Sequence, residues 1–476
     1  MDLPFGKELP QLDVLIVGAG LSGLTSGVKI LAKEHSLNLK ILDECSKPGG
    51  LLGTQGLRFV NKEQTEMINF MSQLNVTLRV REEDEGANLE RCWDLDRGLL
   101  AAPVKFELRR YINMLDLRMK KYSSLRFRFR KRVPNMERHI RSNLFFEQSR
   151  KFMFNLVELF SGLPANEINF DEFMCLCSSC GGLSVIIDIY FKMPKSMMDV
   201  SCKKLLDTLI EKLHDIEILK NVKVVKVKHF KDYVEVTNSI GKPYTAQAVI
   251  LAIPWERVNE LQFEPPLPKQ YFKPSAHKDR SKKLLTQFFM RYTKSHWVYQ
   301  GYSGHFLSVE PFVVGYENQP TEYSGYMMHS PDESNSVRET VLEMLAENFG
   351  EEMQNPLEYQ EQTMELNTTL SSPQTKPWLR VIWSGSSTVA TKNRNLMGGA
   401  VESGIRAAVS ALYVVRPQVV SWRDLQEVQD RKLYEGISLS RVSALLSRIN
   451  LYNFTFYSVF VIGLVFLLNF GYGQSA

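Results

Sequence analysis

Residues 12–43 read LDVLIVGAGLSGLTSGVKILAKEHSLNLKILD, and this stretch decides the fold. The apolar run at 14–17 predicts a buried strand, and the glycines after it predict a tight turn. A helix-like stretch then runs through about Lys33, and residues 39–42 predict a second strand that ends at Asp43. The order strand, helix, strand within about 30 residues is typical of a β-α-β unit. The chain is therefore predicted to have an α/β fold.

The turn after the first strand has the glycine spacing of a dinucleotide-binding site. Gly18, Gly20 and Gly23 form the pattern Gly-x-Gly-x-x-Gly, and Asp43 follows 20 residues after Gly23. The first glycine permits the turn, the second lets the backbone approach a pyrophosphate, and the third lets the helix pack on the sheet. The helix N-terminus offers amides to the phosphates, and the acid can accept both ribose hydroxyls. We therefore expect a bound dinucleotide.

The composition is that of a large globular protein. Of the 476 residues, 44% are hydrophobic and 23% are charged, which excludes a wholly disordered chain and a polytopic membrane protein. The length suggests about two or three domains. A net charge of +5 is too small to imply nucleic-acid binding, and six cysteines fit a reducing compartment better than a disulfide scaffold. The sequence contains neither a His-Glu-x-x-His motif nor a Walker-type phosphate loop.

Further motifs favour FAD over NAD as the cofactor. Gly49 and Gly50 form a pair six residues past the ribose-binding acid, which resembles the extended FAD motif. Residues 398–408, GGAVESGIRAA, resemble the closing flavin helix of the same class, whose N-terminal amides face the flavin pyrimidine oxygen. Residues 173–182, FMCLCSSCGG, and 263–268, FEPPLP, resemble stretches of the flavin-containing amine oxidases. The chain thus resembles this family, and most closely the monoamine oxidases.

This resemblance implies a Rossmann-like α/β FAD-binding domain, an interleaved α+β substrate domain and a C-terminal transmembrane helix. The FAD-binding domain would comprise residues 1–77, 203–283 and 376–415, and the substrate domain residues 78–202 and 284–375. The implied reaction is oxidation of a small-molecule amine, or a related substrate, by hydride transfer to the flavin. A homodimer is implied as well. The expected FAD-binding residues are Gly18, Gly20, Ser22, Gly23, Asp43, Gly49, Gly50, Val224 and Met397.

Several positions depart from the family pattern on the side of the site that would face the substrate. The family's flavin-side lysine falls at Gln287, and one ring of its tyrosine pair falls at Leu396. Between Glu365 and Trp383 there is neither a cysteine for a covalent flavin link nor a tyrosine for the second ring. The flavin-side Gly-Gly-Ser-Tyr turn falls at residues 56–59, which read GLRF. We therefore expect non-covalent FAD and leave the catalytic residues unassigned.

Two readings of these departures stay open. Ser387, which stands where the family has a glutamate, is a further departure. Lys282 and Lys283, however, lie close enough to Gln287 to supply the family's lysine in a shifted alignment. In the first reading the chain is an active FAD-dependent amine oxidase-like oxidoreductase. The alternative is a catalytically degenerate membrane scaffold that binds flavin or ADP on the same fold.

The C-terminal end predicts a membrane anchor. Residues 454–472 read FTFYSVFVIGLVFLLNFGY and carry no charge. About 19 residues at 1.5 Å each span roughly 28 Å, close to the hydrocarbon thickness of a bilayer. We predict a single-pass tail anchor at 453–472, a helical connection at 416–452 and a cytosolic body; a buried core helix is the alternative. The resemblance favours the mitochondrial outer membrane over the endoplasmic reticulum.

A basic segment lies in the expected substrate domain. Residues 118–141 are rich in lysine and arginine, and residues 125–132, LRFRFRKR, alternate aromatic and basic side chains. The segment is interpreted as a solvated face with its phenylalanines turned inward, as a surface for anionic lipid, or as a nucleic-acid site. Nucleic acid is the least favoured partner.

A cysteine cluster lies just before the Gly181-Gly182 pair. Cys175, Cys177 and Cys180, with Cys202 as a fourth ligand, have a spacing that a zinc ion could use. Because the surrounding residues resemble an ordinary helix end of the family, we expect packed thiols and no metal.

Overall fold

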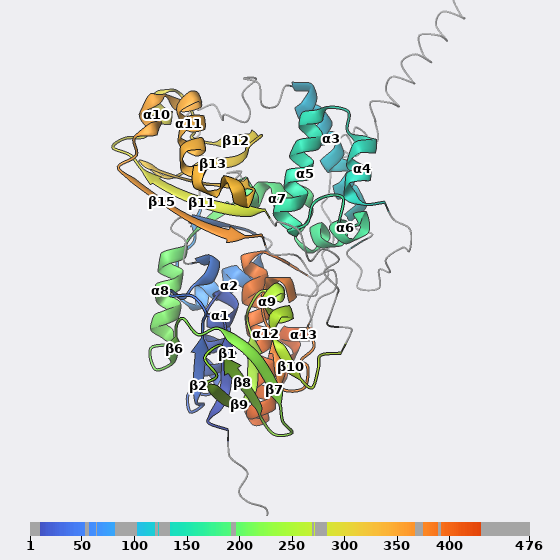
Figure 1. Ribbon diagram of the computed structural model, residues 1–476, viewed down its shortest axis with the longest axis vertical. Helices are drawn as coiled ribbons and strands as arrows, with labels where there is room; N and C mark the ends of the chain where they lie inside the picture. Colours follow the sequence, from blue (N-terminus) through green and yellow to red (C-terminus); the bar gives the residue numbers. More distant parts are fainter. Residues whose placement is uncertain are drawn as a thin grey trace, which may run out of the picture.

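The computed structural model shows two packed halves (Figure 1). In Figure 1 the lower half holds a largely parallel sheet with helices, and the upper half holds an antiparallel sheet beside a group of helices. The described residues are 10–52, 57–62, 64–80, 102–119, 122, 134–191, 197–268, 271, 283–366, 375–388 and 392–429.

Eight strands form the lower sheet, counted over the described residues. They are β1 (Leu12–Val17), β2 (Leu39–Leu42), β6 (Glu217–Leu219), β7 (Val224–His229), β8 (Val234–Asn238), β9 (Pro243–Leu251), β10 (Gln262–Glu264) and β16 (Val381–Trp383). The order is β10-β7-β8-β9-β1-β2-β6, and β16 pairs with the end of β9. Because β1 pairs in parallel with both β2 and β9, the strand that carries the glycine turn is central.

Most elements predicted from the sequence are present in the lower half. The β-α-β unit consists of β1, helix α1 (Leu21–Lys33) and β2, with the expected ends at Lys33 and Leu42. The strands of the sheet come from residues 12–42, 217–264 and 381–383. They thus lie in the three pieces expected for the FAD-binding domain, although the domain boundaries themselves stay a prediction.

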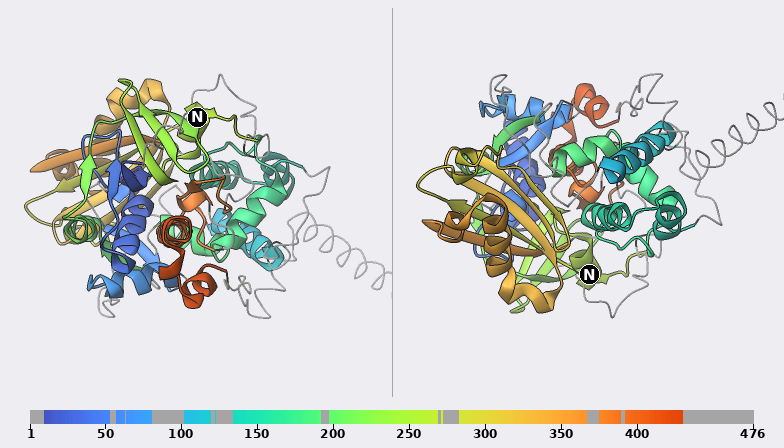
Figure 2. Two further views of the ribbon diagram at one scale, coloured as in Figure 1. Left: turned by 90° about the horizontal axis from the view of Figure 1, so that it is seen from below. Right: turned by 90° about the horizontal axis from the view of Figure 1, so that it is seen from above.

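Helix α1 packs against helix α12 (Met397–Val415) at backbone distance. The Ser26 Oγ hydroxyl donates a hydrogen bond to the Gly404 carbonyl (3.0 Å). A Cβ atom on Gly404 would lie 2.6 Å from the Ser22 carbonyl oxygen and 2.8 Å from Thr25 Cβ. Figure 2, left, shows α12 nearly end-on beside α1. The glycine is therefore required by close packing between two helices whose sequences lie far apart.

A three-stranded sheet and four further helices complete the framework. The strands β3 (Leu57–Asn61), β5 (Met197–Ser201) and β4 (Arg79–Val80) pair in the order β3-β5-β4. The helices are α2 (Thr65–Gln73), α8 (Cys202–Lys212), α9 (Trp255–Glu260) and α13 (Trp422–Gln429). Helix α13 is the described part of the predicted helical connection.

The helical group of the upper half is held together by charged caps that come from one helix, α3 (Ala102–Met119). The others are α4 (Met136–Asn143), α5 (Glu147–Ser161), α6 (Phe170–Ser179) and α7 (Leu183–Tyr190). The buried Glu107 carboxylate accepts from the amides of Phe145 and Phe146 before α5, and that of Asp116 accepts from the Leu183 and Ser184 amides of α7. The Arg110 guanidinium donates to the Asn143 carbonyl at the end of α4 (2.9 Å). Each charge thus matches the helix dipole at the end that it contacts.

The upper sheet packs on both of its faces. Its strands are β11 (Leu284–Arg291), β12 (Phe306–Val309), β13 (Phe312–Gln319), β14 (Glu322–His329) and β15 (Glu358–Glu365). They lie in the order β12-β13-β14-β11-β15, and each strand is antiparallel to its neighbours. Phe312 and Val314 join the core with the helical group, and Val313 joins the core beneath α10 (His296–Tyr299) and α11 (Val337–Phe349). This alternation follows the period of two in a strand.

Residues 306–319 form a hairpin. Strands β12 and β13 are joined at Glu310-Pro311, and Val309 pairs with Phe312. Proline has no amide to donate to a ladder, so it marks the turn.

The membrane-related predictions lie largely outside the described residues, including the anchor at 453–472 and the alternating stretch at 125–132. Within the described part of the chain, no single helix combines the length and apolar composition needed to cross a bilayer. Helices α6 and α7 together would, but the chain bends by 67° between them.

The contact between α1 and α12 gives a first testable prediction. Gly404→Ala should destabilise the apoprotein by about 1–3 kcal/mol, because the new methyl group must push backbone apart in a packed core. Thermal unfolding measures the effect. The matched control is Gly20→Ala, since a Cβ atom on Gly20 meets no atom within 4 Å. Equal melting temperatures for the two variants would contradict the packing.

Candidate functional site

The glycine turn after β1 is shaped by two internal contacts and one open side. A Cβ atom on Gly18, whose φ is +105°, would lie 2.4 Å from the Ala252 carbonyl oxygen. One on Gly23 would lie 2.0 Å from the Gly18 carbonyl oxygen. At Gly20 the φ is −76°, which any residue adopts, and no atom lies within 4 Å of the Cβ position. Packing thus requires Gly18 and Gly23, whereas the space beside Gly20 suits a ligand that approaches the backbone closely.

The N-terminus of α1 faces the same turn. Its N-cap residue, Gly20, makes no side-chain capping bond, and the first turn contains no acidic residue. The first amides of the helix are therefore left for an external acceptor, and the helix dipole favours a negative one. Ser22, also expected at this site, is buried within this first turn. The donor set fits the pyrophosphate of a dinucleotide.

The second glycine pair docks directly on the first turn. Gly20 and Gly49 form a parallel β-bridge, and the Gly49 amide donates to the Ala19 carbonyl (2.8 Å). Gly49 and Gly50 have φ values of +119° and +52°, so both positions favour glycine. The fold thus brings together two motifs that the sequence placed at the same site.

Asp43 lies at the end of β2 and is buried. Its Oδ2 accepts from the Ala19 amide (2.5 Å), and its Oδ1 accepts from the Cys45 amide (2.7 Å). Burial, followed by the nearby Asp43 charge, raises the pKa of the Cys45 thiol. A carboxylate offers about four acceptor positions, so acceptor capacity remains for a ribose hydroxyl beyond the two amides and the Cys45 thiol. Asp43 therefore both fixes the turn and fits the expected ribose site.

Val224 lies close to Asp43 along the backbone. It is the first residue of β7, and two residues earlier the Val222 amide donates to the Asp43 carbonyl (2.8 Å). Its buried side chain joins the core that contains Val17 and Leu42. The expected Val224 position is thus adjacent to the ends of β1 and β2.

The N-terminus of α12 is held by a residue that the sequence did not single out. The Gln64 Oε1 atom accepts from the Gly398 amide (2.9 Å), and the Gln64 side chain is buried. This amide is therefore not among those that could face a flavin. Met397, the first residue of the helix, is partly exposed and keeps its expected place at this end. No periodicity marks Gln64, which lies just before α2.

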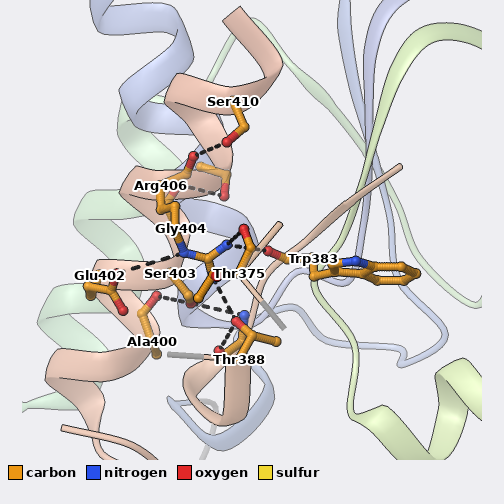
Figure 3. Close-up of polar contacts among 11 residues, drawn as sticks. Thr375, Trp383, Thr388, Ala400, Glu402, Ser403, Gly404, Arg406 and Ser410 are labelled. Carbon is orange, nitrogen blue, oxygen red and sulfur yellow. Dashed lines mark hydrogen bonds and ion pairs between the residues drawn. The ribbon is translucent and has the colours of Figure 1, made fainter. Parts of the chain in front are cut away.

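A buried arginine cluster fixes the turn beside α12 (Figure 3). The Arg406 guanidinium donates to the Thr375 carbonyl (2.9 Å) and to the Thr388 Oγ1 atom (2.8 Å). Its Nε atom lies 3.8 Å from Glu402 Oε1, and burial lowers its pKa to about 10. The Gly385 amide donates to Ser403 Oγ (2.9 Å). Arg406 thus joins α12 to the turn that contains Ser387, where the family has a glutamate.

The structure places the two expected substrate-side positions in packed surroundings. Gln287 lies within β11, between Tyr326 of β14 and Gln362 of β15. Leu396 is buried in the core of the helical group. Of the two lysines considered for a shifted alignment, Lys283 forms an ion pair with Glu158 of α5 (3.3 Å), and Lys282 lies outside the described residues.

Residues 57–59, the described part of the stretch at the family's flavin-side turn, form a strand. Of residues 56–59, Gly56 lies outside the described residues, and Leu57 begins β3, which runs to Asn61 and pairs antiparallel with β5. The physical reason is the register with β5, which continues the ladder through this stretch.

A second buried arginine lies near Leu396. Arg394 is 6% exposed, and burial lowers its pKa. Its carbonyl accepts from the Cys180 thiol (3.1 Å), while the preceding Asn393 amide donates to the Ser179 carbonyl (2.6 Å). The segment before α12 is thus fastened to the end of α6.

The cysteine cluster is packed in the core. Cys177 and Cys180 are buried, and burial raises the pKa of both thiols, that of Cys180 to about 12. Burial also raises the pKa of Cys175 to about 11. Over the described residues, no group of three or more histidine, cysteine or acidic side chains could hold a metal ion.

Comparison with known proteins agrees with the geometry of the site. The family model described as flavin-containing amine oxidoreductase matches residues 21–412. A protein of Mycobacterium tuberculosis named as the flavin-containing monoamine oxidase AofH is 23% identical over 445 residues, which cover 83% of this chain and 96% of that protein.

Solved amine oxidases have the same fold. The cyclohexylamine oxidase from Brevibacterium oxydans aligns with a TM-score of 0.66 at 18% identity, covering 84% of this chain and 99% of that one. Wild-type putrescine oxidase bound to putrescine aligns with a TM-score of 0.67 at 19% identity, with the same coverage. The predictions of an α/β flavoprotein fold and of a flavin cofactor are thus confirmed, because this chain belongs to the flavin-containing amine oxidoreductase family.

Proposed function

We propose that the protein is an FAD-dependent oxidoreductase that oxidises an amine, or a related substrate, and is held at a membrane by its C-terminal segment. The observation that carries the proposal is the turn at Gly18–Gly23, with its open side at Gly20 and Asp43 docked beside it. These residues form a nucleotide cradle from backbone amides and one carboxylate.

The site residues would hold FAD as follows. The first amides of α1 would bind the pyrophosphate, and Asp43 would accept from the ribose hydroxyls. The amide of Met397, at the start of α12, would be the donor to the flavin ring system, because Gln64 holds this helix end through the Gly398 amide and Arg406 joins the middle of the helix to Thr388. Bound FAD supplies a hydride acceptor at its ring system.

The cofactor is proposed to be bound without a covalent bond. None of the cysteines lies after residue 202, so none is in the segment before α12 where the family's flavin link falls. The cysteines are Cys45, Cys92, Cys175, Cys177, Cys180 and Cys202.

A second candidate is a catalytically degenerate scaffold that binds flavin or ADP at a membrane. It is favoured by the side chains at two positions: Leu396 is buried where the family has a tyrosine, and Gln287 lies where the family has a lysine. These substitutions remove groups that would act on an amine but leave the nucleotide cradle unchanged. Both candidate functions therefore include flavin binding, but only the oxidoreductase oxidises an amine.

The location is proposed from the sequence of the tail. The uncharged residues 454–472 have the length of a bilayer span, and Arg441 and Arg448 precede them. The body would then face the cytosol. The mitochondrial outer membrane is proposed ahead of the endoplasmic reticulum.

Gly20→Ala tests the nucleotide cradle. The methyl group would occupy the open side of the turn and displace the pyrophosphate, with a loss of roughly 1.5–3 kcal/mol per charge-assisted hydrogen bond, or about 10–100-fold in affinity. FAD titration of the apoprotein measures the change. Gly325→Ala in β14 is the control, because a Cβ atom there would lie 2.1 Å from the Val314 carbonyl oxygen in the other half and should reduce stability but not FAD affinity per folded molecule. Unchanged affinity in Gly20→Ala would exclude this turn as the site.

The state and activity of the flavin separate the two candidate functions. The absorbance of the purified protein should show flavin bands, and the flavin should move to the supernatant on acid precipitation. Without the aromatic pair, an amine loses about 0.5–2 kcal/mol per ring in cation–π-type attraction, so phenylethylamine should be oxidised slowly. Anaerobic bleaching by any amine of a panel would support the oxidoreductase. Flavin that no amine bleaches would favour the scaffold.

Deletion of the residues after Asn450 tests the anchor. The full chain should resist carbonate extraction, because the uncharged span is buried in hydrocarbon, and the truncated chain should enter the soluble fraction. Fractionation of cells that express each form measures the difference. A truncated chain that still pellets and resists carbonate would show that the span lies elsewhere.

A further inference from the structure

One face of α3 exposes apolar and basic side chains together. Phe106 is 55% exposed and Leu117 is 40% exposed, and Arg109 is exposed between them. These positions are i, i+3 and i+11, which fall on one side of a helix with 3.6 residues per turn. The opposite side of the helix carries the buried residues Leu108 and Leu115. The exposed stripe thus lies on the solvent side of a helix whose other side is in the core, and it is interrupted at the buried Arg110, which donates to the Asn143 carbonyl.

A third large apolar side chain lies next to this stripe. Phe145, just before α5, is 53% exposed, and its amide donates to the carboxylate of Glu107, the neighbour of Phe106. Figure 1 shows α3, α4 and α5 side by side at the upper right, and α3 and α5 are in contact. We refer to Phe106, Arg109, Leu117, Arg118 and Phe145 as the α3 face.

The charge of the α3 face is positive. Arg109 and Arg118 are exposed. Burial lowers the pKa of His139 in α4, and the Arg118 charge lowers it further. The nearby carboxylates are engaged elsewhere: Glu107 accepts from two backbone amides, and Glu137 pairs with Arg141 (2.8 Å). The arginines of the α3 face are therefore not neutralised by these acids.

We propose that the α3 face docks on an anionic lipid bilayer. Protruding phenylalanine and leucine side chains set among arginines suit the headgroup boundary, where apolar groups enter the acyl region and cations meet lipid phosphates. The arginines among these apolar side chains give the face a charge complementary to that of anionic lipid. The proposal goes beyond the tail anchor, because it states which side of the body faces the bilayer.

Tryptophan quenching by lipids tests the orientation. The full chain carrying Phe145→Trp is reconstituted with vesicles of phosphatidylcholine alone, or with one quarter phosphatidylserine, whose acyl chains are brominated. Ile240→Trp is the matched control, because Ile240 is 83% exposed in the loop between β8 and β9 of the other half. Quenching of each added tryptophan is measured relative to the unsubstituted chain.

The expected result is strong quenching at position 145 and none at 240, increased by phosphatidylserine and reduced by Arg109→Glu with Arg118→Glu. No added quenching at 145 would overturn the proposal, whether or not the chain resists carbonate extraction, so failure of the tail anchor is scored separately. Equal quenching at both positions would also overturn it. Loss of the quenching on addition of a single-stranded RNA would assign the face to nucleic acid instead.

Discussion

The close approach of backbone to backbone around Gly18–Gly23 is the constraint on which the rest of this structure depends. A side chain at Gly23 would strike the Gly18 carbonyl, and one at Gly404 would strike the Ser22 carbonyl. With glycine at these positions, β1, α1 and α12 meet without intervening side chains. The nucleotide turn, the start of α12 and the turn held by Arg406 are therefore positioned by one set of contacts.

This arrangement separates the site into two parts with different physical origins. The nucleotide part is formed by main-chain amides and by Asp43, whose two oxygens are fixed by the amides of Ala19 and Cys45. The substrate part depends on the identities of side chains such as Gln287 and Leu396. A backbone amide remains in place when its residue is substituted, whereas a side-chain functional group is lost. The same fold can thus keep its ligand while the chemistry beside it changes.

The sequence predicted the elements whose signal is local. The glycine spacing, the apolar strands and Asp43 lie within one β-α-β unit, so a short pattern determines them. Gln64 and Arg406 could not be predicted in this way, because the partner of Gln64 is Gly398, 334 residues away, and Arg406 bonds a carbonyl outside its helix. The hairpin at Glu310-Pro311 could have been predicted, since its proline interrupts the strand pattern.

The caps that α3 provides have a consequence for the order of folding. Glu107, Arg110 and Asp116 reach partners 38, 33 and 67 residues away, so the contacts that close the helical group span short distances in the sequence. The lower sheet is different, because β1 pairs with β9 and β9 pairs with β16 near the end of the chain. Short-range contacts form faster than long-range ones. During synthesis the contacts among α3, α4, α5 and α7 can therefore form on the ribosome before β9 has emerged to pair with β1, and a chain halted before β9 would hold these helices without the centre of the parallel sheet.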